Sequence, residues 1–158
     1  MAVEPMTPSV ERALEWAYPG EEARYFSPMA IGSTPATADE GAAAILAGVK
    51  TTTSSGFWDR PDGRIPFVGA LSVLLDGQGR MRAIVETERV AIISFGSVDE
   101  DLARSCGEGD RTLAWRRSAM GDYYRRDAAR RGVAFSDDTA LVFEWIVVAR
   151  RLESFLDL

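Results

Sequence analysis

Apolar residues recur at helical spacing near the start of the chain. One stripe consists of Val10, Ala13, Leu14 and Ala17. This stripe predicts a helix over residues 8–18, with Thr7 as its N-cap and Pro19-Gly20 as its end. We expect a loop to follow.

A second helical pattern lies in "TADEGAAAILAG", residues 37–48. Thr37 and Glu40 stand at the spacing of a capping box, which places the start of this helix at Thr37. Gly48 falls where a left-handed helix end belongs. Lys50 therefore follows directly after the end of a predicted helix.

Three later stretches have the composition of β-strands. Thr51 to Thr53 are β-branched and favour an extended chain. Residues 67–75 and 80–93 flank the turn "DGQG" and predict a hairpin of two long strands. Residues 139–152, "TALVFEWIVVARRL", predict a further strand near the end of the chain.

Two further helices are expected between the hairpin and this strand. "SVDEDLARSC" predicts a short helix with Ser97 as its N-cap, and residues 110–132 predict a longer one that starts at Asp110 and bends at Gly121. Helices and strands are interleaved without regular βαβ alternation. The pattern therefore predicts an α+β fold with a mainly antiparallel, curved sheet.

The composition fits one soluble domain, with 158 residues, 46% of them hydrophobic, and a net charge of −6. This balance argues against broad electrostatic capture of polyanions. Residues 111–131 depart from it, because they hold seven arginines and only two aspartates. Trp115, Tyr123 and Tyr124 lie among these arginines, which suits phosphate contact with base stacking. A solvated helix with an aromatic inner face fits the same pattern.

The chain contains no histidine, which excludes Ser-His-Asp triads, Cys-His dyads and His-ligated zinc. Its single cysteine, Cys106, has no partner for an internal disulfide. No stretch approaches the roughly 20 apolar residues of a membrane span. The first residues lack the pattern of a secretory signal, so we expect a cytoplasmic protein without a membrane partner.

Lys50 is the only lysine among 18 basic residues. A desolvated lysine can lose its proton and act as a base, whereas a guanidinium stays charged. Lys50 could alternatively cap the preceding helix as a cation. Side chains alternate along a strand, so Lys50 shares a pocket with Thr53 only if it lies in a turn. Glu108 is the leading acid, since flanking glycines let the backbone place it in a pocket; a solvated loop acid is the alternative.

Seven motifs occur in one order along the chain. They are "IGST" (31–34), "ADE" (38–40), "AGVKTTT" (47–53), "VGALSVLLDGQGR" (68–80), "VETERVAIISFGSV" (85–98), "GEGDRTLAW" (107–115) and "FSDDTALVFEWIVV" (135–148). Together they resemble the ASCH domain family, over about residues 25–150. The resemblance divides the chain into an N-terminal helical extension, residues 1–24, and an ASCH domain, residues 25–158.

This resemblance implies a PUA-like, mainly antiparallel β-barrel with surrounding helices. Family members are regarded as RNA-binding modules; some resemble ribonucleases, and a shorter branch contains amidohydrolases that deacetylate N4-acetylcytidine. The lysine and threonine of that branch fall on Lys50 and Thr53, and its glutamate on Glu108. The chain departs from the family at Ser33 and Ala70, where Asp is frequent, and at Met120, where a helical His is frequent. The absent imidazole weakens the enzyme interpretation.

The leading hypothesis is a hydrolase acting on RNA or on a modified nucleoside such as N4-acetylcytidine, with catalytic Lys50, Thr53 and Glu108. No cofactor is required, although a divalent metal ion held by Glu108 could assist cleavage of a phosphodiester. The alternative is a non-catalytic module that binds RNA or regulates through it. A monomer and a homodimer both remain open. Candidate substrate-binding residues are Thr51, Trp58, Arg82, Arg111, Trp115, Arg116 and Tyr123.

Overall fold

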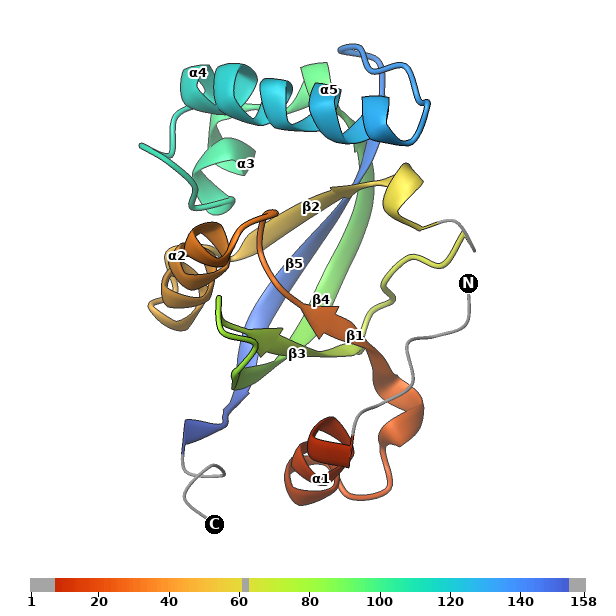
Figure 1. The fold of residues 1–158 in the computed structure, drawn as a ribbon, viewed down its shortest axis with the longest axis vertical. Helices are drawn as coiled ribbons and strands as arrows, with labels where there is room; N and C mark the ends of the chain where they lie inside the picture. The colour runs from red at the N-terminus through yellow and green to blue at the C-terminus, as the bar shows by residue number, and fades with distance from the viewer. Residues whose placement is uncertain (1–7, 61–62, 154–158) are drawn as a thin grey trace.

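Five strands form one sheet in the order β1-β3-β4-β5-β2 (Figure 1). The computed structural model describes residues 8–60 and 63–153. The strands are β1 (Tyr25–Met29), β2 (Thr52–Gly56), β3 (Leu71–Leu75), β4 (Met81–Ser94) and β5 (Ala140–Arg151). β1 pairs with β3 in parallel, and the other three pairings are antiparallel. The α+β fold and the predicted hairpin are therefore confirmed.

The sheet is strongly curved but does not close. β4 and β5 are 14 and 12 residues long. Their pairing shifts register between Ile84 and Val85 and again between Thr87 and Arg89. Such bulges bend a strand and increase its twist. β1 and β2 stand at the two ends of the strand order and do not pair with each other in the described residues, which leaves the predicted barrel open.

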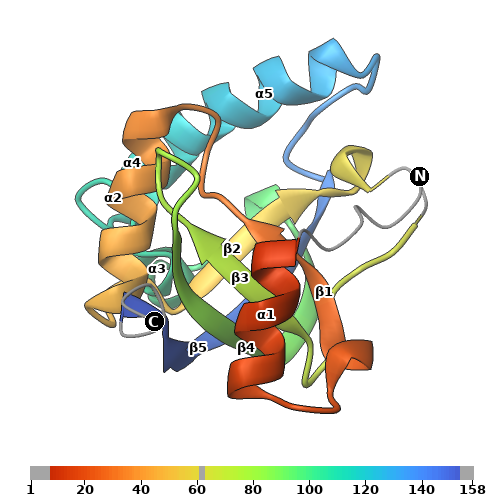
Figure 2. The same ribbon diagram turned by 60° about the horizontal axis from the view of Figure 1, so that its bottom comes forward.

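Helices cover the sheet at both of its ends (Figure 1). α1 (Pro8–Ala17) packs Val10 and Leu14 against Val73 of β3. α2 (Pro35–Leu46) shares a second apolar cluster with β3, β4 and β5, and Figure 2 shows this helix alongside the sheet. α1 is thus part of the core, while the division into an extension and a domain at residue 24 stays a prediction.

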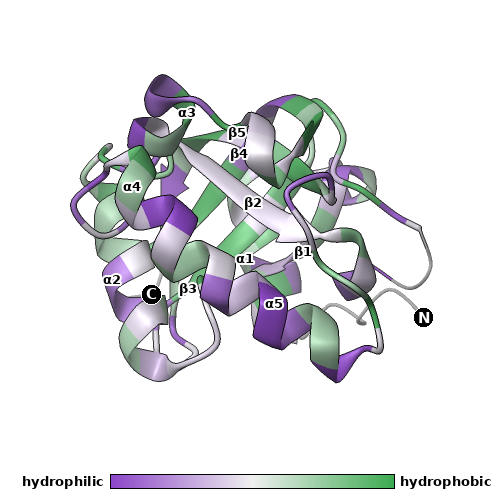
Figure 3. Ribbon diagram, turned by 90° about the horizontal axis from the view of Figure 1, so that it is seen from above, coloured by the Kyte–Doolittle hydropathy of each residue, from purple (hydrophilic) through white to green (hydrophobic). Residues whose placement is uncertain are grey.

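A third apolar cluster joins β5 to the helices that follow β4. These are α3 (Glu100–Ser105), α4 (Leu113–Trp115), a π-helical turn η4 (Arg116–Met120) and α5 (Gly121–Arg130). The π-helical turn η4 ends immediately before Gly121, the residue at which a bend was predicted. Figure 3 shows hydrophilic colour over much of α5, whereas the strands are mostly green except for the pale, hydroxyl-rich β2. Short 3-10 helices are η1 (Glu22–Arg24), η2 (Phe57–Asp59) and η3 (Phe95–Ser97).

Residues 25–29 were expected in a loop, and this expectation is wrong because they form β1. Pro28 interrupts the strand pattern of "YFSPM" and lacks a backbone N–H. An edge strand tolerates this, since only one of its sides is paired. The pairing partner, β3, lies more than 40 residues away in sequence.

The predicted capping box of α2 is also wrong. The helix begins one turn earlier, with Thr34 as N-cap and Pro35 as its first residue. The backbone N–H of Thr37 donates to Thr34 Oγ1, and that of Thr34 donates to Thr37 Oγ1, both at 3.1 Å. Thr37 therefore closes a Thr-Thr box from the third helical position.

Two more helix starts differ from the predictions. α3 is capped by Asp99 rather than Ser97, since Leu102 N donates to Asp99 Oδ1 at 2.8 Å. α4 is capped by Thr112 rather than Asp110, which accepts instead from the backbone and hydroxyl of Thr112. The N-cap predicted at Thr7 lies outside the described residues. Within the described part, no helix is both long and apolar enough to span a membrane.

Candidate functional site

A cavity of about 740 Å³ lies between the two unpaired sheet edges, β1 and β2. α2, the loop 107–109 and the segment from α4 to α5 complete its walls, and β5 contributes to its lining. The polar residues that line it are Ser27, Ser33, Thr37, Glu40, Lys50, Thr53, Ser54, Ser55, Asp59, Arg60, Glu108, Tyr123, Tyr124 and Glu144. Lys50, Thr53 and Glu108 therefore share one cavity, although 58 residues separate the first from the last.

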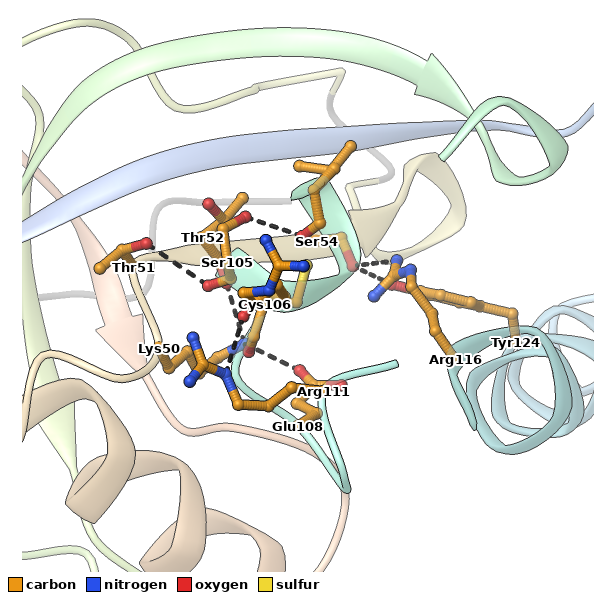
Figure 4. Close-up of polar contacts among 12 residues, drawn as sticks. Lys50, Thr51, Thr52, Ser54, Ser105, Cys106, Glu108, Arg111, Arg116 and Tyr124 are labelled. Carbon is orange, nitrogen blue, oxygen red and sulfur yellow. Dashed lines mark hydrogen bonds and ion pairs between the residues drawn. The ribbon is translucent and has the colours of Figure 1, made fainter. Parts of the chain in front are cut away.

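Lys50 is buried at this cavity and is only 2% exposed. Its Nζ donates to the carbonyl oxygens of Thr52 at 3.0 Å and Cys106 at 2.9 Å. It also forms an ion pair with Glu108 Oε1 at 2.8 Å (Figure 4). Three acceptors match the three hydrogens of an ammonium group. The donors of Lys50 Nζ are therefore all used within the protein.

Lys50 lies in the short segment that joins the end of α2 to β2. Gly48 has a φ of 74°, the left-handed conformation predicted for it. The backbone N–H groups of Val49 and Lys50 both donate to Ala44 O, at 2.9 and 3.0 Å. β2 begins only at Thr52. The geometric condition for Lys50 and Thr53 to share a pocket is therefore met.

Glu108 is held by a loop that glycine makes possible. Gly107 and Gly109 have φ values of 64° and 58°. A Cβ on Gly107 would lie 2.6 Å from Lys50 Cα, so the loop packs directly on the lysine backbone. Glu108 Oε2 accepts no hydrogen bond within the described residues, and the side chain is 21% exposed. One carboxylate oxygen thus binds Lys50, which leaves the other for a further partner.

Hydroxyl groups extend from Lys50 along β2. Thr53 lines the cavity, and its hydroxyl makes no hydrogen bond within the described residues. Ser54 Oγ lies 2.6 Å from Tyr124 Oη and accepts from Arg116 Nη2 at 3.0 Å (Figure 4). Burial raises the pKa of Tyr124. Tyr124 therefore remains a neutral hydrogen-bonding group.

Arg116 lies behind this cavity wall rather than on it. It is 2% exposed, and its guanidinium carbon is 5.3 Å from the centre of the Phe143 ring. Its Nε and Nη1 have no hydrogen-bond partner in the described residues. Arg116 thus acts on the cavity through Ser54.

The other predicted binding residues divide into two groups. Trp115 and Tyr123 line the cavity. Thr51, Trp58, Arg82 and Arg111 do not. Trp58 donates from Nε1 to Asp127 at 2.7 Å, and its ring packs on Tyr124 and Phe135. Arg82 lies near Asp76 and Glu153. Arg111 is exposed and donates to Arg104 O.

The sequence interpretation missed three acids of the cavity, Glu40, Asp59 and Glu144. Burial and the neighbouring charge of Asp127 raise the pKa of Asp59. Glu144 is 5% exposed in the middle of β5. An ionisable residue within the apolar run "LVFEWIVV" was the available signal.

No group of three or more Cys, Asp or Glu side chains in residues 8–60 and 63–153 is placed to hold a metal ion. A metal ion bound by Glu108 therefore stays a hypothesis for experiment. Cys106 is buried, and burial raises the pKa of its thiol. Its contribution to the site is the carbonyl oxygen that binds Lys50.

An open, five-stranded PUA-like sheet with a cavity between its edges defines the class of protein. The sequence profile of the ASCH domain matches residues 27–149. The chain therefore belongs to the ASCH domain family, a PUA-like family associated with RNA binding.

Two solved structures have a similar fold. The chain is similar to an ASCH domain from Lactobacillus crispatus JV V101, with 28% identity and a TM-score of 0.80 over 95% of this chain and 99% of that chain. It is also similar in fold to protein EF3133 from Enterococcus faecalis V583, with 22% identity and a TM-score of 0.75 over 84% and 80% of the two chains. No curated protein matches the sequence.

Proposed function

We propose that the protein binds RNA, or a nucleoside derived from it, in the cavity and hydrolyses a bond of this ligand. The observation that carries the proposal is the ion pair between buried Lys50 and half-buried Glu108, at 2.8 Å, in the same cavity as Thr53. An ionised pair of this kind can hold a carboxylate in a fixed position for proton transfer. Trp115 and Tyr123 provide aromatic surface for a base.

The proposed chemistry assigns one role to each of the three residues. Glu108 takes a proton from an attacking water through its open oxygen and later returns it to the leaving group. Thr53 orients this water with its free hydroxyl. Lys50 remains an ammonium group, which fixes Glu108 and stabilises negative charge that develops in the cavity.

The same proton transfers could support hydrolysis of either of two kinds of bond. In an N-acyl nucleoside, the water oxygen forms a bond to the carbonyl carbon, the C–N bond breaks, and the nitrogen receives the proton. In a phosphodiester, a P–O bond forms, another breaks, and the departing oxygen receives the proton. A divalent ion near Glu108 would assist only the second reaction.

A non-catalytic RNA-binding module is the second candidate. One observation favours it, because all three donors of Lys50 Nζ are used within the protein. A lysine of this kind can serve as a clamp between β2 and the loop 107–109 without taking part in chemistry.

The first test measures turnover of two substrates. Purified protein is incubated with labelled RNA, with and without a divalent ion, and separately with N4-acetylcytidine. We expect Glu108→Gln to reduce kcat by about 100-fold or more, with little change in KM, since general acid-base catalysis contributes 10²–10⁴-fold. Thr53→Val should also reduce kcat, whereas Thr51→Val is the matched control outside the cavity and should leave it unchanged.

Lys50→Arg keeps the charge but replaces a compact ammonium by a planar group. We expect loss of turnover together with a lower melting temperature, because three acceptors converge on one nitrogen. If wild-type protein turns over neither substrate while it still binds RNA in a salt-dependent manner, the hydrolase proposal is wrong and the binding module stands.

A further inference from the structure

Glu144 is a second carboxyl group of the cavity, and its surroundings differ from those of Glu108. It lies in β5, directly opposite Thr53 of β2 in the antiparallel register. Only 5% of the residue is exposed, yet it contributes to the cavity lining. In the described part of the chain it forms no ion pair, and its one hydrogen bond comes from Thr87 Oγ1 to Oε2 at 3.2 Å.

An ionised carboxylate is costly in such a position. Removing a charge from water without a paired partner is strongly unfavourable, so a buried carboxyl tends to stay neutral. Burial accordingly raises the pKa of Glu144, while the hydrogen bond from Thr87 and the charge of Arg60 oppose this shift. A neutral carboxyl carries an O–H donor beside a C=O acceptor.

The arrangement is also unfavourable for folding alone. An apolar side chain of similar size would fit the run "LVFEWIVV" and bury no polar atoms. Thr87 engages only Oε2, which leaves Oε1 without a hydrogen-bond partner in the described residues. A ligand in the cavity is the partner that would use this remaining oxygen.

The neighbouring walls indicate a planar ligand. Trp115, Tyr123 and Met120 line the same cavity as Glu144. Aromatic faces stack on bases irrespective of base identity, whereas hydrogen bonds to the pairing edge discriminate among them. The cavity thus combines aromatic stacking surface with the donor-acceptor pair of Glu144.

We propose that Glu144 is the recognition residue of the cavity and, as a neutral acid, pairs with the edge of a nucleobase that carries an N–H beside an acceptor. This inference rests on the proposed binding of RNA or a nucleoside. It assigns different roles to these two carboxyl groups. Glu108, paired with Lys50, transfers protons, and Glu144, in its protonated form, recognises the base.

The test compares two substitutions at one position. The dissociation constants of the four ribonucleosides are measured by isothermal titration or NMR for wild type, Glu144→Gln and Glu144→Leu. Glutamine keeps a donor beside an acceptor, so we expect its dissociation constant for the preferred nucleoside to rise less than about threefold. Leucine keeps the volume but removes both groups, and we expect a rise of about tenfold or more, the value of one hydrogen bond.

Thr87→Val is the control, because it removes the hydrogen bond to Oε2 from a residue that does not line the cavity. It should change the dissociation constant less than threefold, and thermal unfolding should show that all variants fold. Equal losses for glutamine and leucine, or a loss in Thr87→Val as large as that of Glu144→Leu, overturn the assignment. So does unchanged binding in Glu144→Leu. If wild type binds RNA but none of the four ribonucleosides, the assignment of Glu144 is wrong while the proposed function stands; if wild type binds neither, the proposed function itself is wrong.

Discussion

The contacts of Lys50 explain why this one basic position of the chain holds a lysine rather than an arginine. Three oxygen atoms lie 2.8–3.0 Å from its Nζ. An ammonium group directs three hydrogens from one atom, whereas a guanidinium spreads its donors over a planar fork. The geometry of the acceptors therefore requires a lysine without requiring that it lose a proton. The unusual composition located the residue, but only the folded contacts define its role.

Glu144 gives a prediction for the pH dependence of stability. Burial raises its pKa above that of the unfolded chain, so the folded protein retains the proton to higher pH. The contribution of the Glu144 carboxyl to the free energy of unfolding is fully present below the usual glutamate pKa of about 4.3. It decreases as the pH rises through the raised pKa of the folded state. Glutamine does not titrate. We expect Glu144→Gln to gain stability relative to wild type between pH 4 and pH 8, measured by urea denaturation.

Glu88→Gln is the matched control for this experiment, since Glu88 is an exposed glutamate of β4. The difference in the free energy of unfolding between Glu88→Gln and wild type should not increase comparably with pH. A constant difference between Glu144→Gln and wild type across this range would contradict the assigned burial effect.

At the scale of elements, the loop 107–109 is the part of the site that the sequence predicted best. Glycines on both sides of Glu108 indicated an unusual backbone, and both have positive φ. The sequence could not show that Gly107 packs on Lys50, because this contact joins segments 57 residues apart. The glycines of the sequence indicate the backbone conformation of the loop, whereas its contact with Lys50 is determined by the tertiary fold.

Gly107→Ala tests this contact. Alanine in a left-handed conformation costs about 1–2 kcal/mol, and the new Cβ would also meet the Lys50 backbone. Gly79→Ala is the matched control, because Gly79 has a φ of 73° and no atom within 4 Å of its Cβ position. We expect Gly107→Ala to lower the free energy of unfolding by more than Gly79→Ala and to impair ligand binding. Equal losses would show that the loop yields easily.

The starts of helices were predicted less well than their existence. Several residues that can act as N-caps stand within a few positions of one another, as with Thr34 and Thr37, or Ser97 and Asp99. Local propensity does not decide between them, since the choice depends on which backbone N–H groups remain without partners. β1 escaped prediction for a related reason. Its pairing with β3 is parallel and distant in sequence, so no local hairpin signal exists.

At the scale of the whole molecule, an excess of arginine is concentrated in residues 111–131. α1 and the segment from α4 to α5 lie at opposite ends of the sheet in Figure 1. The chain carries −6 overall, yet arginine dominates residues 111–131. An RNA backbone would therefore meet the α4–α5 end more favourably than the rest of the surface.

Arg126→Gln tests whether RNA binds at the arginine-rich α4–α5 end. Arg126 suits this test because it is exposed on α5 and forms no ion pair within the described residues. We expect weaker RNA binding and a salt dependence reduced by about one unit of slope for a lost phosphate contact. Filter binding over a range of salt concentrations measures both. Arg12→Gln on the exposed side of α1 is the control, and an equal effect there would contradict the proposed orientation.

Chemical modification of the buried Lys50 can also measure local opening of the structure around it. Since Lys50 is the only lysine and is 2% exposed, acylating reagents meet no accessible ε-amine while its surroundings stay closed. Acylation of this side chain requires that the bonds to Thr52, Cys106 and Glu108 separate first. The rate of Lys50 acylation, measured by mass spectrometry, therefore reports how often the cavity around this residue opens in the wild-type protein.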